Sequence, residues 1–306
     1  MSKTAADFGS WEIEDRVKFE DTGSGLVRCD IQTPLARAQV YLHGAHVTLF
    51  QPAGAEPVLF LSRQSHFSPG KAIRGGVPIC FPWFGPLAGH PEAPMHGFAR
   101  RMEWDLDSVT AAPTGEVRLT LSLTASDATR AHWPHDFILR HAIDIGASLS
   151  MALTVENTGA EPFTIEEALH TYLAVGDVRE VEVAGLEHAA YLDKTDGFKT
   201  KSLTAEPLRF TGETDRVFPG HTAACTLHDP LLRRRLLIEK SGSDTTVVWN
   251  PWIAKAAAMA DFADDEWPQM LCIETANTGA NAVTVAPGAQ HTMRATVGAG
   301  RMKDEG

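Results

Sequence analysis

The sequence predicts an all-β protein, a large antiparallel β-sandwich with few short helices. Many short runs are rich in β-branched and aromatic residues, turn residues such as Gly, Pro and Asn separate these runs, and helical patterns are rare. No internal repeat, low-complexity tract or linker divides the 306 residues. We therefore expect a single domain over residues 1–306.

The expected elements follow an N-terminal stretch, ending at Asp21, that holds one short helix or an irregular lead-in. Helical signals are confined to residues 126–132 and to a short piece within 254–261. Alternation and turn signals predict strands at residues 26–31, 38–42, 46–50, 58–61, 117–122, 137–145, 148–156, 163–175, 178–183, 223–227, 236–239, 245–249, 270–275, 282–285 and 290–297.

The predicted strand at residues 163–175 carries the most informative pattern. One of its faces is aliphatic, and the other places His170 and Glu166 beside Ala168, which leaves room for a ligand. An imidazole held on a rigid strand is a candidate general acid or base near neutral pH. The alternative is a structural histidine, which is the commoner use of such a residue.

Residues 62–101 form a long irregular segment rich in Gly, Pro, Ser and aromatic residues, which predicts an ordered loop that carries a site. Arg74 precedes two glycines, and Arg100 ends the run His-Gly-Phe-Ala-Arg. Two guanidinium groups that converge from these positions would bind a phosphate or carboxylate. The alternative, of equal weight, is that one or both arginines pair with carboxylates of the protein.

Carboxylates supply the other candidates. Glu274 ends an apolar run, Met270-Leu-Cys-Ile-Glu, so we expect a partly buried acid whose raised pKa suits a general base, or else a paired carboxylate at the rim of the strand. Asp215 stands at the entry to a strand, where it could accept hydrogen bonds from hydroxyls, pair with Arg216 or cap a turn. The acidic run at residues 264–266 is predicted to be a solvated turn.

Composition excludes several functions. The net charge of −12 disfavours nucleic acid and anionic membrane as partners, so an anionic ligand would need local arginines. No membrane-spanning run or signal peptide is visible, and the four scattered cysteines are expected to be reduced thiols, so we expect a cytoplasmic protein. Signatures of metal hydrolases, serine hydrolases, dinucleotide sites and P-loops are missing from the sequence.

Six segments then occur in a diagnostic order: Ile-Arg-Gly-Gly-Val-Pro-Ile-Cys-Phe-Pro-Trp-Phe-Gly (73–85), His-Gly-Phe-Ala-Arg (96–100), Ala-Leu-His-Thr-Tyr (168–172), Thr-Asp-Arg (214–216), Trp-Asn-Pro-Trp (249–252) and Cys-Ile-Glu (272–274). Together they resemble the hexose-6-phosphate mutarotases, also called glucose-6-phosphate 1-epimerases, of the galactose-mutarotase-like superfamily. The resemblance covers about residues 25–297 and implies the supersandwich fold of that superfamily.

The resemblance implies a reaction, the interconversion of α and β anomers of a hexose 6-phosphate, with glucose 6-phosphate as the expected substrate. His170 matches the general acid, which protonates the ring oxygen, and Glu274 matches the general base, which takes the proton of the anomeric hydroxyl. No metal or organic cofactor is implied, and the expected working unit is a monomer.

The resemblance also implies binding roles: Arg74 and Arg100 match phosphate-binding arginines, and His96 and Asp215 match positions that contact the sugar. One departure is Met95, where relatives often have a polar residue. Two alternatives stay open, an aldose 1-epimerase acting on unphosphorylated sugars and a non-catalytic carbohydrate-binding protein. The two arginines count against the first, and the His170/Glu274 pair counts against the second.

Overall fold

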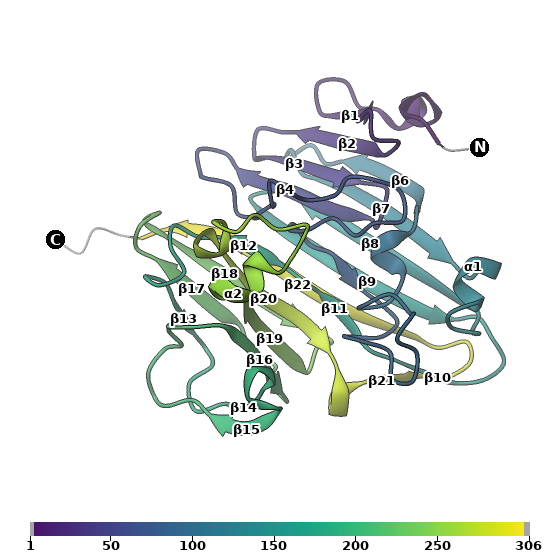
Figure 1. The fold of residues 1–306 in the computed structure, drawn as a ribbon. Helices are drawn as coiled ribbons and strands as arrows, with labels where there is room; N and C mark the ends of the chain where they lie inside the picture. The colour runs from purple at the N-terminus through teal and green to yellow at the C-terminus, as the bar shows by residue number, and fades with distance from the viewer. Residues whose placement is uncertain (1–2, 303–306) are drawn as a thin grey trace.

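The computed structural model describes residues 3–302 and confirms the all-β prediction (Figure 1). At one end, drawn at the top of Figure 1, lies a four-stranded antiparallel sheet in chain order, made of β1 (Val17–Asp21), β2 (Val27–Gln32), β3 (Ala36–Tyr41) and β4 (His46–Pro52). Buried residues alternate with exposed ones along these strands, as expected of a sheet with one face on the core.

Over residues 3–302, two eight-stranded antiparallel sheets form the body of the fold. The first has the order β15-β14-β16-β19-β20-β11-β5, with β12 also paired to β20. Its strands are β5 (Ile79–Cys80), β11 (Glu167–Leu169), β12 (Tyr172–Ala174), β14 (Ala190–Asp193), β15 (Lys199–Ser202), β16 (Thr214–Pro219), β19 (Thr245–Asn250) and β20 (Met270–Asn277).

The second sheet has the order β13-β17-β18-β22-β9-β8-β7-β6. Its strands are β6 (Asp105–Ala111), β7 (Val117–Thr124), β8 (Phe137–Ile145), β9 (Ser148–Asn157), β13 (Glu182–Ala184), β17 (Cys225–Asp229), β18 (Arg234–Ser241) and β22 (Gln290–Arg301). A separate pair joins β10 (Phe163–Ile165) to β21 (Val283–Val285).

Helical structure is sparse in the described chain, as predicted. The α-helices are α1 (Asp127–Arg130) and α2 (Trp252–Ala257), and 3-10 turns occupy Ala5–Trp11, Ala99–Arg101, Lys194–Asp196, Trp267–Gln269 and Gly279–Asn281. Ser126 caps α1 by accepting a hydrogen bond from the Thr129 backbone N–H, so the helix begins where the sequence indicated. One large apolar cluster fills the space between the sheets.

The predicted continuous strand at residues 163–175 is wrong, because the chain forms three short strands there, β10, β11 and β12. The breaks fall at Glu166 and at His170-Thr171, where the backbone N–H groups of Glu166 and His170 donate to the carbonyls of Pro82 and Pro78. The irregular segment 62–101 thus takes over part of the pairing. His170 consequently stands at a gap between two strands, where its side chain can face a cavity.

Other differences concern elements that the sequence did not indicate. Residues 58–61 make only isolated bridges, such as Leu59 with Leu173, and are not a strand. Strands β1, β6, β14 and β15 and the two-residue β5 were not predicted, whereas β16 begins at Thr214, next to the strand entry expected at Asp215. Strands β14 and β15 form the hairpin at the bottom of Figure 1. That hairpin carries a side chain of the candidate site.

Candidate active site

All sequence-predicted site residues except Arg100 line one cavity of about 400 Å³, a volume typical of small-molecule sites. His170 comes from the gap between β11 and β12, Glu274 from β20, and Asp215 from β16. The irregular segment 62–101 supplies the rest. The charged and imidazole side chains that line the cavity are Arg74, His96, His170, Lys194, Asp215, Lys255 and Glu274.

His170 and Glu274 are in direct contact at the floor of this cavity. His170 Nε2 lies 3.4 Å from Glu274 Oε1, and the two side chains are only 8% and 1% exposed. Burial, together with the charges of Arg100 and Arg74, holds the pKa of His170 well below its usual value. Burial and the charge of Asp215 hold the pKa of Glu274 well above its usual value. The lowered pKa of His170 and the raised pKa of Glu274 together favour a pair that holds one proton, on Glu274.

Aromatic rings fix the orientation of His170. The ring of Tyr172 is stacked on the imidazole at a centroid distance of 4.8 Å and an angle of 13°, and Trp249 meets it edge-on at 6.0 Å. His170 Nδ1 and Glu274 Oε2 are buried without a hydrogen-bond partner in the described chain. Unsatisfied buried polar atoms are costly, and at this site they belong to the two candidate acid–base residues.

His96 is held by backbone geometry. Its φ is +62°, a left-handed value that non-glycine residues rarely adopt, and its Nδ1 accepts a hydrogen bond of 3.1 Å from the Gly85 N–H. An accepting Nδ1 leaves the proton of the neutral ring on Nε2. Burial and the charge of Arg100 lower the pKa of His96, which keeps the ring neutral. His96 is therefore a fixed hydrogen-bond donor 5.8 Å, between ring centroids, from His170.

Arg74 reaches the cavity because two glycines shape its loop. Gly75 and Gly76 have φ of +112° and +62°, and a Cβ on them would lie 2.5 Å from Phe60 O and 2.2 Å from Val47 O. The guanidinium is held at both ends, since Nη1 donates to Tyr172 Oη and Nη2 to Asp261 Oδ2, each at 3.0 Å. Arg74 therefore pairs with a carboxylate of the protein, as one of the two alternatives expected. It also lines the cavity.

Arg100 lies behind the cavity wall, 8% exposed, and Nη2 donates to the Met95 carbonyl at 2.7 Å. Within residues 3–302 it has no carboxylate at ion-pair distance, and its Nε has no hydrogen-bond partner. Burial of this cation lowers its own pKa, and its charge lowers the pKa values of His96 and His170. An unpaired buried cation favours an anionic ligand nearby.

The sequence patterns missed three charged residues at this site. Lys194, in the turn between β14 and β15, lies 3.1 Å from Asp215 Oδ2 and 5.6 Å from the centroid of Phe84. Lys255 on α2 reaches Asp215 at 4.0 Å, and Asp261 holds Arg74. Neither lysine belongs to a recognisable motif, so only the fold reveals them.

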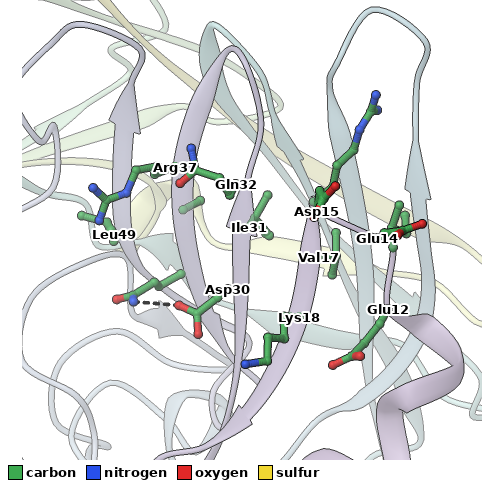
Figure 2. Close-up of a pocket in the computed structure, with 14 residues that line it drawn as sticks. Glu12, Glu14, Asp15, Val17, Lys18, Asp30, Ile31, Gln32, Arg37 and Leu49 are labelled. Carbon is green, nitrogen blue, oxygen red and sulfur yellow. Dashed lines mark hydrogen bonds between the residues drawn. The ribbon is translucent and has the colours of Figure 1, made fainter.

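A larger hollow of about 700 Å³ lies over the N-terminal sheet (Figure 2). Most of its charged side chains, among them Glu12, Lys18 and Arg37, are exposed, and Figure 2 shows these three on separate segments of the chain and not converging. Asp30 is already bound by Gln39 and Arg28. This hollow lacks the buried, perturbed acid–base pair of the smaller cavity, so the smaller cavity is the candidate active site.

Two further structural facts apply to residues 3–302. No group of three or more His, Cys, Asp or Glu side chains there is arranged to hold a metal ion, and none of the helices is long and apolar enough to cross a membrane. The four cysteines are free and buried.

This chain is similar to known proteins in sequence and in fold. Proteins of Salmonella typhimurium (strain LT2) and Escherichia coli (strain K12), both named "Putative glucose-6-phosphate 1-epimerase", are 38% and 39% identical over 245 and 246 residues, which is 80% of this chain and 81% of each relative. The crystal structure of a "putative mutarotase" from Salmonella typhimurium superimposes with a TM-score of 0.89 at 32% identity, covering 95% of both chains.

The fold is also that of more distant proteins. A galactose mutarotase-like protein from Clostridium acetobutylicum, 13% identical, superimposes with a TM-score of 0.69 over 94% of this chain and 98% of its own, which confirms the expected galactose-mutarotase-like fold. The aldose 1-epimerase family model matches residues 29–297. The chain therefore belongs to the aldose 1-epimerase family.

Proposed function

We propose that this protein interconverts the α and β anomers of a hexose 6-phosphate, with glucose 6-phosphate as the substrate of choice. The observation that carries the proposal is the buried contact of 3.4 Å between His170 and Glu274, in a cavity near the half-buried Arg74 and the buried Arg100. The names of the relatives, glucose-6-phosphate 1-epimerases, support the same substrate.

Opening a cyclic hemiacetal requires one proton delivered and one removed. His170 as general acid gives a proton to the ring oxygen while Glu274 as general base takes the proton of the anomeric hydroxyl. The bond from C1 to the ring oxygen breaks as the C1 carbonyl forms. Rotation about C1–C2 then presents the other carbonyl face, and the same two groups reverse their roles as the ring closes. Protons balance over the cycle, so the reaction uses the groups of the pair alone.

A pair that carries one proton suits this reversible chemistry, because either direction starts with one acid and one base. The lowered pKa of His170 and the raised pKa of Glu274 favour neutral His170 and protonated Glu274. A phosphate dianion bound beside Arg74 and Arg100 would offset the cationic charge that disfavours imidazolium, so substrate binding would shift the proton toward His170. His170 would then begin the reaction as the acid.

Phosphate recognition is assigned to Arg74 and Arg100. Arg100 is a buried cation without a carboxylate at ion-pair distance in residues 3–302, and Arg74 keeps a buried Nε without a partner. Guanidinium groups bind phosphate oxygens through charge-assisted hydrogen bonds. His96, as a fixed donor, and Asp215, as an acceptor held by Lys194, would contact sugar oxygens. Local cations in an otherwise acidic protein would explain how it retains an anionic sugar.

We infer a monomer as the working unit, as the resemblance to the mutarotases implied. The free, buried cysteines and a phosphorylated substrate support a cytoplasmic place of action. Light scattering on the purified protein would test the first point, with a dimer as the contrary result.

Anomer exchange measured by NMR magnetisation transfer tests the function. We expect exchange of glucose 6-phosphate to accelerate in the presence of the protein, well above exchange of free glucose and galactose, and Glu274→Gln to abolish the acceleration. Equal acceleration of free sugars would replace the proposal with an aldose 1-epimerase for unphosphorylated sugars. A folded protein that accelerates none of them would be a carbohydrate-binding protein without this activity.

A further inference from the structure

Arg74 is held more firmly than a flexible surface arginine. Tyr172 Oη accepts from Nη1 and Asp261 Oδ2 accepts from Nη2, both at 3.0 Å, while Nε remains buried without a partner. Tyr172 is itself 1% exposed, and its ring lies flat against His170. The two contacts occupy the terminal nitrogens of the guanidinium and leave the remaining N–H groups for a ligand.

The segment that carries Asp261 is anchored to the segment that precedes Arg74. Phe262, fully buried, packs on Phe60 at a ring distance of 5.7 Å, and the Phe60 carbonyl accepts from the Gly76 N–H at 2.6 Å. The backbone of Arg74 is also fixed, since its N–H donates to Ser65 Oγ at 2.7 Å. Backbone and side chain of Arg74 are therefore both defined before a ligand arrives.

We propose that Asp261 and Tyr172 are positioning residues that orient Arg74 toward the phosphate of the substrate. This inference rests on the proposed function, because it assigns a purpose to the arginine that would bind the phosphate. Preorganised donors bind an anion more tightly than donors that must be ordered on binding. The Tyr172 hydroxyl and the Asp261 carboxylate contact Arg74, so loss of these two polar contacts, with the Tyr172 ring kept against His170, acts on substrate binding.

The charge of Asp261 has an opposite effect, since a carboxylate beside Arg74 repels an anionic phosphate. Replacing the carboxylate by an amide separates the orientation of Arg74 from the repulsion of the phosphate. Asp261→Asn keeps an oxygen that accepts from Nη2 and removes the negative charge, whereas Asp261→Ala removes both. Because a hydrogen bond to a charged group is strong, we expect loss of orientation to outweigh relief of the repulsion in the Ala variant.

The test compares these variants by steady-state anomer exchange of glucose 6-phosphate, with inorganic phosphate as a competitive probe. Asp261→Ala should raise KM and the inhibition constant of phosphate about tenfold while kcat stays within about threefold. Asp261→Asn should restore both constants to within about threefold of the parent. Tyr172→Phe, which keeps the ring against His170, should raise KM without lowering kcat.

Asp265→Asn is the matched control, because Asp265 also pairs with an arginine, Arg63, but both side chains are exposed and lie outside the cavity lining. Its constants should equal those of the parent. An unchanged KM in Asp261→Ala would overturn the proposal. So would a parallel loss of kcat that Asp261→Asn fails to rescue, because that result describes a structural residue.

Failure of the proposed function is distinguishable from failure of this inference. If the parent protein accelerates no sugar, binding of inorganic phosphate followed by ³¹P NMR still reports on Arg74. Weaker phosphate binding in Asp261→Ala, with normal binding in Asp261→Asn and Asp265→Asn, would support the positioning role alone. Equal phosphate binding in all four proteins would overturn it.

Discussion

His170 Nε2 lies 3.4 Å from Glu274 Oε1, so the candidate acid and base are in contact with each other. Residues 104 positions apart meet because β12, just after His170, pairs with β20, which carries Glu274. A substrate would place its ring oxygen and anomeric hydroxyl beside these two side chains, which both line the cavity.

Removing either member of the pair should remove most of the rate. General acid and base groups each contribute about 10² to 10⁴-fold, so we expect kcat for glucose 6-phosphate to fall by about that factor in His170→Ala and in Glu274→Gln. The double variant should be little worse than either single one, since the two groups act as a unit. Additive losses in the NMR exchange assay would contradict a concerted pair.

The same pair predicts a bell-shaped dependence of kcat/KM on pH. Activity follows the singly protonated pair, so it falls as pH drops through the step that adds the second proton and as pH rises through the step that removes the last one. Burial and Arg100 place the acid limb below the usual pKa of histidine, and burial and Asp215 place the alkaline limb above the usual pKa of glutamate.

Enzyme-dependent exchange, corrected for the spontaneous reaction at each pH, would measure this profile. A profile with an acid limb at or above pH 6.5, the ordinary pKa of histidine, would contradict the assignment. The pH profile of the residual activity in Glu274→Gln should lack the alkaline limb, which is the limb assigned to Glu274.

Lys194 should tune both limbs. Burial dominates the pKa shifts of His170 and Glu274, and the charge of Lys194 lowers the pKa of each group. Lys194→Met removes that charge, so both pKa values rise and both limbs of the profile move to higher pH. Lys255→Met is the control, because Lys255 is more exposed and pairs with Glu213 at 3.0 Å. A shift of equal size in Lys255→Met would show that the effect is not specific to Lys194.

Sequence patterns predicted elements that are stabilised locally. Strand β8 has the predicted bounds, 137 to 145, because turns flank a regular alternation of buried and half-buried residues. The segment 163–175 shows the opposite case. Its alternation continues past His170, but the N–H groups of Glu166 and His170 donate to Pro82 and Pro78, and a contact between distant segments leaves no periodic signal.

The site was predictable where a motif marked it, and only there. The distance between His170 and Glu274, the burial of Arg100 and the presence of Lys194 follow from tertiary packing. The predicted solvated turn at residues 264–266 is wrong for Glu266, which is 4% exposed and accepts hydrogen bonds from Ser62 Oγ and the Arg63 side chain. A run of acidic residues usually lies on a solvated surface. The run itself does not show which of its carboxylates is buried by a loop.

Buried histidines should make the fold sensitive to acid. Burial lowers the pKa of His46 to about 3 and that of His141 to about 4, against 6.5 when exposed. The unfolded chain therefore binds more protons between pH 6.5 and 4, and stability falls as pH is lowered through this range. We expect a loss on the order of 5 kcal/mol in the free energy of unfolding by pH 4.5, with about half from each histidine.

Urea unfolding at several pH values would measure that slope. His46→Gln and His141→Asn place an amide N–H where Nε2 and Nδ1 now bond to the Gly75 and Ala45 carbonyls, and neither amide titrates. The double variant should therefore lose less stability than the parent between pH 6.5 and 4.5. An unchanged slope would assign the acid sensitivity to other groups.

A second buried pair, Glu167 with His291, should stabilise the contact between the two large sheets in a way that depends on pH with the opposite sign. Glu167 Oε1 on β11 lies 3.0 Å from His291 Nε2 on β22, and Asn277 Nδ2 donates to the same oxygen at 2.9 Å. The hydrogen bond to Glu167 raises the pKa of His291. The folded state thus holds the proton more tightly, so this stabilisation is complete below pH 6.5 and disappears as pH rises through the raised pKa.

A double-mutant cycle with Glu167→Gln and His291→Gln would isolate this interaction. We expect a coupling free energy of about 1 to 3 kcal/mol at pH 6, because the carboxylate is fully buried and the imidazole is partly so. The coupling should be smaller at alkaline pH, where His291 is neutral and only a neutral hydrogen bond remains. A coupling that is equal at both values of pH would mean that the pair is held without a charge on His291.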